Sequence, residues 1–255
     1  MEEPGNLTKV FVTSAAGTFG SACVRHLSTN LPTTRVIGSV REMSKSRDKF
    51  LDLRGNNFEL VDVVGDRGLE SLTRGMRGSD AVVIIPPNQR RVDVGKEYVM
   101  AAKNAGVRFI CLLSVSAIGK REVMIARQFA ELEDFIKETW IDACFLRATF
   151  FAENLLANAA SFKRGSFYHP ANPDARFNPI SAADVAAFAT AAIQRNFMEK
   201  KGHRGALSSA PVRADIYYLT GPGAVSMVEV AEILSKVASK FVRCCCCCCF
   251  FPLRC

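Results

Sequence analysis

Apolar runs of five or six residues alternate along the first 150 residues with segments whose apolar residues recur every three or four positions. Continuous apolar runs are typical of buried strands, and a repeat of three to four is typical of amphipathic helices. The pattern predicts strands at 9–13, 35–40, 58–63, 81–85, 109–114 and 143–147. It predicts helices at 21–28, 68–76, 95–106 and 123–138. Strands and helices therefore alternate along most of this part of the chain.

Strands that are apolar throughout indicate a sheet that is covered on both faces, as parallel sheets are. Parallel neighbours need crossover connections, and helical crossovers of one hand produce a doubly wound sheet. The sequence therefore predicts an α/β protein with a doubly wound parallel sheet, the Rossmann fold, over residues 7–150 approximately.

The pattern changes after residue 150, where a loop-rich stretch at 167–180 precedes a predicted helix at 181–193. A strand is predicted at 216–221 and a second amphipathic helix at 226–240, where Ser226 and Glu229 form a capping-box pattern. This part is short and discontinuous, so we expect it to form a small C-terminal substrate-side lobe over 151–239. One domain, 7–239, then contains both parts.

Residues 240–255 contain seven of the ten cysteines, at Cys244–Cys249 and Cys255. Adjacent cysteines cannot all pair in relaxed disulfide geometry, and zinc sites need spaced ligands. S-acylation of the run is one reading, and a low-complexity tail without function is the reading that we prefer. We therefore predict no metal site.

The charge balance adds little to this picture. The 255 residues have a formal net charge of +8, but Lys and Arg are scattered rather than gathered in one segment. Such a charge suits an anionic cofactor, and we predict no nucleic-acid partner. The first residues do not resemble a secretory signal, and no stretch has the ~20 apolar residues of a membrane span. Cys23, Cys111 and Cys144 lie among apolar neighbours, as reduced thiols do, so we expect a cytoplasmic protein.

A candidate nucleotide-binding turn follows the first strand. It reads Ser14-x-x-Gly17-x-x-Gly20, whereas dinucleotide-binding turns usually have glycine at all three places. Gly17 allows the backbone to approach a pyrophosphate, and Gly20 allows close helix–strand packing. Ser14 can replace the first glycine if its φ is negative, and its hydroxyl can add a donor. The position between a strand and a helix predicts dinucleotide binding.

The end of the second predicted strand indicates which dinucleotide is bound. NAD-binding proteins often have an acidic residue here for the ribose 2′-hydroxyl, but this chain has Arg41, followed by Lys45 and Arg47. A guanidinium suits a 2′-phosphate. NADP(H) is therefore predicted in preference to NAD(H). NAD(H) is the alternative, because Glu42 is an acidic residue close to the same position.

Five segments, in this order and spacing, resemble the NmrA-like family of atypical short-chain dehydrogenases/reductases. They are VTSAAGTFG, VREMSKSRDKF, LVDVVGDRGLESLTRGMRGSDAVVIIPP, AAKNAGVRFICLLSVSA and FLRATFFAENLL, and the resemblance runs from about residue 8 to about residue 239. The family's enzyme members include quinone, azo-dye and triphenylmethane reductases. Others are NADP(H)-binding redox sensors that regulate a protein partner without turnover.

The resemblance implies the site residues. The cofactor loop would consist of Ser14, Ala15, Ala16, Gly17, Thr18, Phe19 and Gly20, with Arg41 facing the adenosine phosphate. Asp66 would lie by the adenine, and Ile85, Pro86, Pro87 and Ser114 would lie beside the cofactor at the ends of two strands. Phe150, Phe151, Glu153 and Asn154 match the family's FxEN stretch on the substrate side, and Asp184 matches a family helix.

The chain departs from the family pattern at its catalytic helix. Aligning Glu133 with the family glutamate places Phe129, on the substrate side, where reductases have a lysine that contacts the nicotinamide ribose. The Tyr-x-x-x-Lys pair of ordinary short-chain dehydrogenases is also missing, since Tyr98 and Lys103 are one residue too far apart. That pair supplies a proton to an alkoxide, so its absence favours acceptors that take protons from water. Tyr168 and His169 are the alternative proton donors.

Two functions remain at this point. The first is a reductase that passes hydride from NADPH to a quinone or a similar small planar acceptor. The second is a cofactor sensor that regulates a protein partner. Either function is compatible with a homodimer.

Overall fold

The computed structural model describes residues 7–53, 57–63, 68–169, 172, 174–199, 214–237 and 242–246. The chain divides into two compact units, which are described separately below. The first unit combines Met1–Ala148 with Ala182–Leu219, and the second combines Thr149–Ser181 with Thr220–Cys255.

A seven-stranded parallel sheet forms the first unit, in the order β3-β2-β1-β4-β5-β6-β8. The strands are β1 (Lys9–Val12), β2 (Arg35–Val40), β3 (Phe58–Asp62), β4 (Ala81–Ile84), β5 (Phe109–Val115), β6 (Asp142–Ala148) and β8 (Ala214–Leu219). The chain reverses its direction of travel through the sheet between β1 and β4, which are neighbours. In doubly wound folds this switch point is where ligands bind, at the carboxyl ends of the strands.

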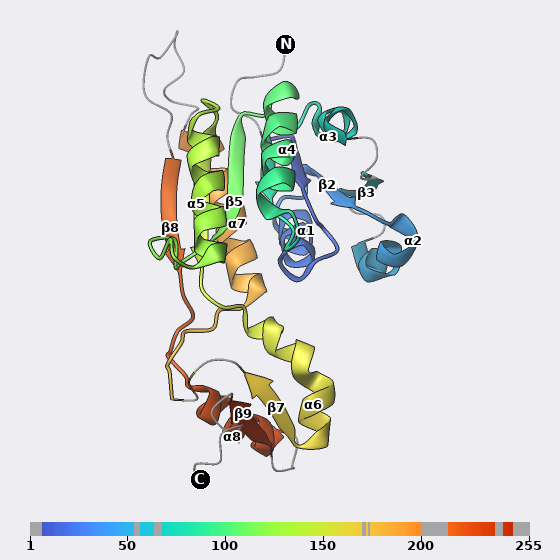
Figure 1. Ribbon diagram of the computed structural model, residues 1–255. Helices are drawn as coiled ribbons and strands as arrows, with labels where there is room; N and C mark the ends of the chain where they lie inside the picture. The colour runs from blue at the N-terminus through green and yellow to red at the C-terminus, as the bar shows by residue number, and fades with distance from the viewer. Residues whose placement is uncertain are drawn as a thin grey trace. The chain divides into compact units, whose positions relative to one another are not determined.

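Helices cover both faces of this sheet (Figure 1). Helices α3 (Gly68–Met76), α4 (Arg91–Asn104) and α5 (Met124–Lys137) pack side by side on one face. Helices α1 (Thr18–Asn30) and α7 (Ala182–Glu199) pack together on the other face, and α2 (Met43–Ser46) and the 3₁₀ segment η1 (Arg47–Leu53) follow β2. The predicted Rossmann fold is confirmed. Within the described ranges, no helix is both long enough and apolar enough to cross a bilayer.

The central strands are buried because they are apolar on both faces. Every residue of β4 is buried, and Phe11, Ile110, Leu112 and Phe145 belong to one core with the apolar faces of α4 and α5. The three thiols Cys23, Cys111 and Cys144 are free and buried, as predicted. Burial raises the pKa of Cys23, and a hydrogen bond with Cys111 together with burial raises that of Cys144.

The second unit is smaller. It contains η3 (Ala152–Asn158), α6 (Ala159–Arg164), β7 (Ser166–His169), α8 (Met227–Val237) and β9 (Arg243–Cys246). Met227, Val230, Ala231 and Val242 form its core. The predicted capping box is confirmed, since the Ser226 N–H donates to Glu229 Oε2 (2.7 Å) and the Glu229 N–H donates to Ser226 Oγ (3.1 Å).

The structure differs from the sequence-based expectation in two places. We expected 151–239 to form one lobe, but β8 pairs with β6 and α7 packs on α1, so Ala182–Leu219 group with the sheet. We expected 167–180 to be loop-rich and assigned no strand to the low-complexity tail 240–255, but β7 and β9 pair in parallel. Backbone pairing tolerates cysteine, which behaves as a small apolar residue. The rest of the cysteine run lies outside the described residues.

Asp80 joins the amino ends of the strands. Its carboxylate accepts hydrogen bonds from the Thr8 N–H (2.6 Å), Thr8 Oγ1 (2.8 Å) and the Lys9 N–H (3.0 Å), and it pairs with Arg108. Burial alone would raise the pKa of Asp80, but the hydrogen bonds from Thr8, Arg108 and Lys9 outweigh burial and hold it below the usual value of an aspartate. Because the folded pKa is the lower one, the carboxylate stabilises the fold above about pH 4, and this stabilisation is lost as the pH falls through the folded pKa.

We therefore expect Asp80→Asn to lower the free energy of unfolding at pH 7 by about 1–3 kcal/mol, because the charge-assisted bonds are lost. The difference from the wild type should shrink at pH 3, as denaturant unfolding at both pH values can measure. Asp93→Asn is the control, since its pair with Arg90 (3.6 Å) is exposed and should contribute under about 1 kcal/mol. Equal losses in both variants would contradict this role for Asp80.

Candidate functional site

Hydroxyl groups at the end of β1 fasten it to the end of β4. The Ile85 N–H donates to Thr13 Oγ1 (2.7 Å), and the Ser14 hydroxyl donates to the Ile85 carbonyl (2.9 Å). The Thr13 N–H also donates to the Val83 carbonyl (3.0 Å). These bonds fix the two strand ends that flank the switch point, where the predicted turn begins.

Ser14 has a left-handed backbone, with φ of +51°. The expectation that serine replaces glycine here through a negative φ is therefore wrong. Serine takes the conformation that glycine adopts readily, at a cost of about 1–2 kcal/mol for an L-residue. The bond from its hydroxyl to Ile85, together with the bond from the Gly17 N–H to the Ser14 carbonyl (3.0 Å), holds this conformation in place.

The two glycines of the turn satisfy the predicted requirements. Gly17 is the N-cap of α1, where no side chain caps the helix and the first turn has no acidic residue. A Cβ on Gly20 would lie 2.3 Å from the Ser14 carbonyl oxygen and 2.9 Å from Ala15 Cα, so any side chain there would displace the turn. An uncapped helix start without carboxylates leaves the positive end of the helix dipole able to bind an anion.

The remaining predicted cofactor residues are distributed around this turn. Ala15 donates its N–H to the Ser39 carbonyl (2.9 Å), and the Ala16 carbonyl accepts from Lys49 Nζ (2.9 Å). Thr18 and Phe19 begin α1. Arg41 is exposed directly after β2, and Lys45 pairs with Glu42 (2.8 Å). Pro86 and Pro87 follow Ile85, whereas Asp66 lies outside the described residues.

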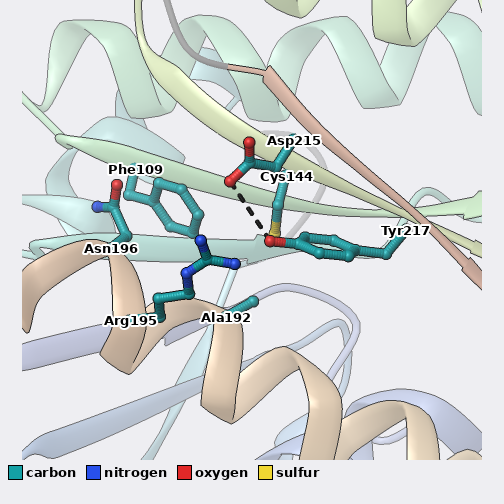
Figure 2. Close-up of a pocket in the computed structure, with 7 residues that line it drawn as sticks. All are labelled: Phe109, Cys144, Ala192, Arg195, Asn196, Asp215 and Tyr217. Atoms are coloured by element: carbon teal, nitrogen blue, oxygen red, sulfur yellow. Dashed lines mark hydrogen bonds between the residues drawn. The ribbon is translucent and has the colours of Figure 1, made fainter. Parts of the chain in front are cut away.

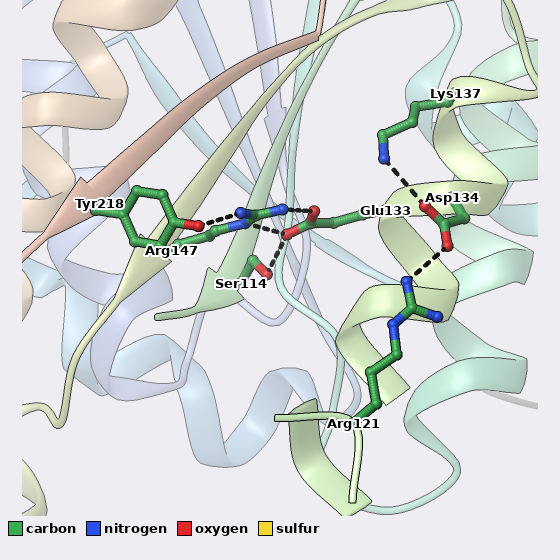
Figure 3. A network of polar contacts seen from close by, with 7 residues as sticks. All are labelled: Ser114, Arg121, Glu133, Asp134, Lys137, Arg147 and Tyr218. Atoms are coloured by element: carbon green, nitrogen blue, oxygen red, sulfur yellow. Dashed lines mark hydrogen bonds and ion pairs between the residues drawn. The ribbon is translucent and has the colours of Figure 1, made fainter. Parts of the chain in front are cut away.

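Ser114 belongs to a buried polar network at the carboxyl ends of β5 and β6 (Figure 3). Its hydroxyl donates to Glu133 Oε1 (2.7 Å), and Arg147 holds the same carboxylate through Nε (3.0 Å) and Nη2 (2.6 Å). Arg147 Nη1 also donates to the Tyr218 hydroxyl. Glu133 raises the pKa of Arg147, which stays charged. The Ser114 hydroxyl therefore already has an acceptor, and its contact with a cofactor stays a prediction.

Two functional candidates were missed in the sequence. Tyr98 on α4 is partly buried, and burial raises its pKa, while a side-chain hydrogen bond with Ser14 lowers it. Arg91, the first residue of α4, is only 6% exposed, and its guanidinium lies over the Phe129 ring at 5.0 Å. A cation at a helix start is electrostatically unfavourable, but the sequence predicted this helix to begin at residue 95, so that conflict became visible only in the structure.

The predicted substrate-side residues Phe150, Phe151, Glu153 and Asn154 belong to the second unit. Phe150 packs edge-to-face against Phe177 (5.5 Å), and Phe151 forms a bridge with Ile180 just before η3. Tyr168 and His169 lie on β7, where their backbone pairs with residues of β9. Their roles as substrate contacts and proton donors stay predictions.

The close-up in Figure 2 shows a small pocket near the amino ends of the strands, opposite to the end where the predicted turn lies. Its lining residues come from β5, β6, α7 and β8: Phe109, Cys144, Ala192, Arg195, Asn196, Asp215 and Tyr217. Phe109 and Asp215 stand at the amino ends of their strands, and the Tyr217 hydroxyl donates to Asp215 (3.3 Å). The pocket contains none of the predicted site residues. Among the described residues, no three His, Cys, Asp or Glu side chains are grouped as metal ligands.

Comparisons with known proteins agree with this geometry. The sequence profile of the NmrA-like family matches residues 7–245. An NAD(P)H azoreductase of Xenophilus azovorans is 31% identical over 237 residues, which cover 92% of this chain and 75% of that protein. Quinone oxidoreductase 2 of Escherichia coli (strain K12) is 26% identical over 236 residues, which cover 91% and 76%. The crystal structure of an Escherichia coli NADPH-dependent quinone oxidoreductase complexed with NADPH shares the fold, with a TM-score of 0.72 at 24% identity, over 92% of this chain and 77% of that one.

The left-handed Ser14 generates one prediction. Ser14→Val should lower the free energy of unfolding by about 2 kcal/mol or more, because a β-branched residue is strained at positive φ and the bond to Ile85 is lost. Ser14→Gly loses the same bond but relieves the strain, so it should stay within about 1 kcal/mol of the wild type. Equal destabilisation of both variants, measured by denaturant unfolding, would contradict the role of φ.

The buried ion pair generates another. Arg147→Met leaves the Glu133 carboxylate buried without its partner and should cost about 3–5 kcal/mol of stability. Adding Glu133→Gln should recover much of that loss. Arg121→Met is the matched control, because Arg121 pairs with Asp134 (3.4 Å) on the exposed side of α5 (Figure 3). If the double variant is as unstable as Arg147→Met, the pairing is not what stabilises this region.

Proposed function

The chain belongs to the NmrA-like family, and on this premise we propose that it binds NADP(H) at the carboxyl ends of β1 and β4 and reduces a quinone or a related planar acceptor. When bound, NADPH would supply a hydride, so that the acceptor takes up this hydride and a proton and NADP⁺ is formed.

The observation that carries the proposal is the turn from Ser14 to Gly20 at the switch point. Gly20 has room for no side chain, and Gly17 presents an uncapped helix start without acidic residues. These residues fit a pyrophosphate, which backbone N–H groups at a helix start can bind. The bonds from Thr13 and Ser14 to the end of β4 would keep this cradle in one conformation.

Arg41 supports NADP(H) in preference to NAD(H). It is exposed directly after β2, where a dinucleotide-binding fold reads the adenosine ribose. Its neighbour Lys45 is paired with Glu42 (2.8 Å), which neutralises the acid next to Arg41 in the sequence. A free guanidinium fork suits the 2′-phosphate through two parallel hydrogen bonds.

Two relatives support a reductase in preference to a sensor, because their names are azoreductase and quinone oxidoreductase. The residues at the site restrict the kind of acceptor. Burial raises the pKa of Tyr98, whose side chain engages Ser14, and no lysine follows it at the spacing of an acid catalyst. A quinone needs no strong acid, because the reduced oxygen can be protonated by water. Orientation of the two reactants then supplies most of the rate.

The direct test is a titration with NADPH and NADH. Arg41→Ala should weaken NADPH binding about tenfold or more and leave NADH binding nearly unchanged, since only NADPH has the 2′-phosphate. Trp140 lies between α5 and β6, at the amino end of the strand, whereas the cofactor is proposed to bind at the carboxyl ends. Its fluorescence is therefore a poor reporter of binding, and NADPH emission or calorimetry is the suitable readout. Arg35→Ala is the control, at the opposite end of the same strand.

Turnover is then measured as NADPH oxidation with 1,4-naphthoquinone as the acceptor. Oxidation that is lost in a variant of the turn, such as Gly20→Val, supports the reductase. Tight NADPH binding without oxidation by any acceptor would contradict it and favour the sensor. Absence of nucleotide binding would contradict both functions.

A further inference from the structure

Arg91 is a buried cation beyond the carboxyl end of the central strand β4. It is the first residue of α4, which follows the loop that leaves β4, and it is 6% exposed. Its Nη2 donates to Asn88 Oδ1 (3.1 Å) and its Nη1 donates to Gln128 Oε1. Both partners are neutral amides. They fix the guanidinium in place without cancelling its charge.

No opposite charge in the described part of the chain compensates this cation. No carboxylate there pairs with Arg91, and its buried Nε has no hydrogen-bond partner. Its position at the start of α4 adds the positive end of a helix dipole. A buried charge is normally paired, so an unpaired one that is held by two amides indicates a ligand that supplies the counter-charge.

The packing of two helices places Arg91 beside an apolar surface. Gly95, one turn further along α4, lies so close to Leu132 that a Cβ would be 2.7 Å from it. This close approach brings Arg91 over the Phe129 ring at 5.0 Å. Ile125 lies one helical turn before Phe129 and is 39% exposed, next to the exposed Val123 and Met124. An apolar surface therefore adjoins the cation at the start of α5.

We propose that Arg91 determines acceptor specificity by binding a negatively charged oxygen of a planar acceptor whose rings lie against the exposed apolar side chains at the start of α5, Val123, Met124 and Ile125. This inference rests on the proposed reductase function. The guanidinium fork matches the geometry of carboxylate and sulfonate groups, which are the anionic substituents that planar aromatic acceptors can bear. A neutral acceptor would leave the cation uncompensated, so the site selects for charge as well as for flatness.

The experiment compares three acceptors with the same rings: anthraquinone-2-carboxylate, anthraquinone-2-sulfonate and the neutral anthraquinone-2-carboxamide. Calorimetry in the presence of NADP⁺ measures their binding, and NADPH oxidation measures kcat/KM. The variants are Arg91→Gln and Arg91→Lys, with Arg90→Gln as the matched control, because Arg90 carries the same charge one residue away and is exposed. Circular dichroism confirms that each variant is folded, and Arg91→Lys keeps the charge if Arg91→Gln does not fold.

The wild type should bind both anionic acceptors more tightly than the carboxamide. Arg91→Gln should weaken binding of the anions by about tenfold or more, the loss of one charge-assisted hydrogen bond, and change the carboxamide less than about twofold. Arg91→Lys should fall between them, and Arg90→Gln should match the wild type. A stronger effect on the carboxylate than on the sulfonate, or the reverse, identifies which group the fork fits.

Equal weakening of all three acceptors would overturn the proposal and assign Arg91 a structural role. Weaker NADP⁺ binding with unchanged acceptor binding would also overturn it, because the counter-charge would then come from the cofactor. If the wild type oxidises NADPH with none of the acceptors, the proposed function fails. The charge-dependent binding measured by calorimetry still decides the inference about Arg91.

Discussion

The site depends on one connection, the hydrogen bonds that Thr13 and Ser14 make with the backbone of β4. Neighbouring parallel strands are held together along their length by the sheet, but beyond their carboxyl ends no ladder continues. Here the Thr13 and Ser14 hydroxyls extend the connection by two residues, to Ile85. The turn before α1 and the loop before α4 are thereby fixed relative to one another, and the proposed pyrophosphate cradle and Arg91 lie at these two segments.

The amino and carboxyl ends of the strands are built differently. At the amino ends of the strands Asp80 receives hydrogen bonds from Thr8, Lys9 and Arg108, which satisfy its carboxylate. At the carboxyl ends of the strands, Ser14 and Arg90 have positive φ, and Arg91 is a buried charge without a counter-ion. Unfavourable features of this kind persist where the surrounding structure enforces them, and they gather at functional sites.

Most of the fold could be predicted from the sequence because its signals are local. Six strands and the helices between them follow from apolar runs and from a three-to-four repeat, and the capping box of Ser226 and Glu229 follows from a spacing of three residues. The errors concern contacts between distant residues. The φ of Ser14 is set by a bond to Ile85, 71 positions away, and the pairing of β7 with β9 joins segments that are nearly 80 residues apart. Arg91 was missed for the same reason, since its burial depends on Gln128 and Phe129 of another helix.

The burial of Cys23, Cys111 and Cys144 acquires a meaning if the protein handles quinones. Quinones are electrophiles that add to thiolates and arylate them, so a protein that binds them is exposed to damage by its own substrate. The three core thiols are buried, and the raised pKa values of Cys23 and Cys144 keep those two thiols protonated and therefore poorly nucleophilic. The core that positions the site is thereby protected from the quinone chemistry proposed at the carboxyl ends of the strands.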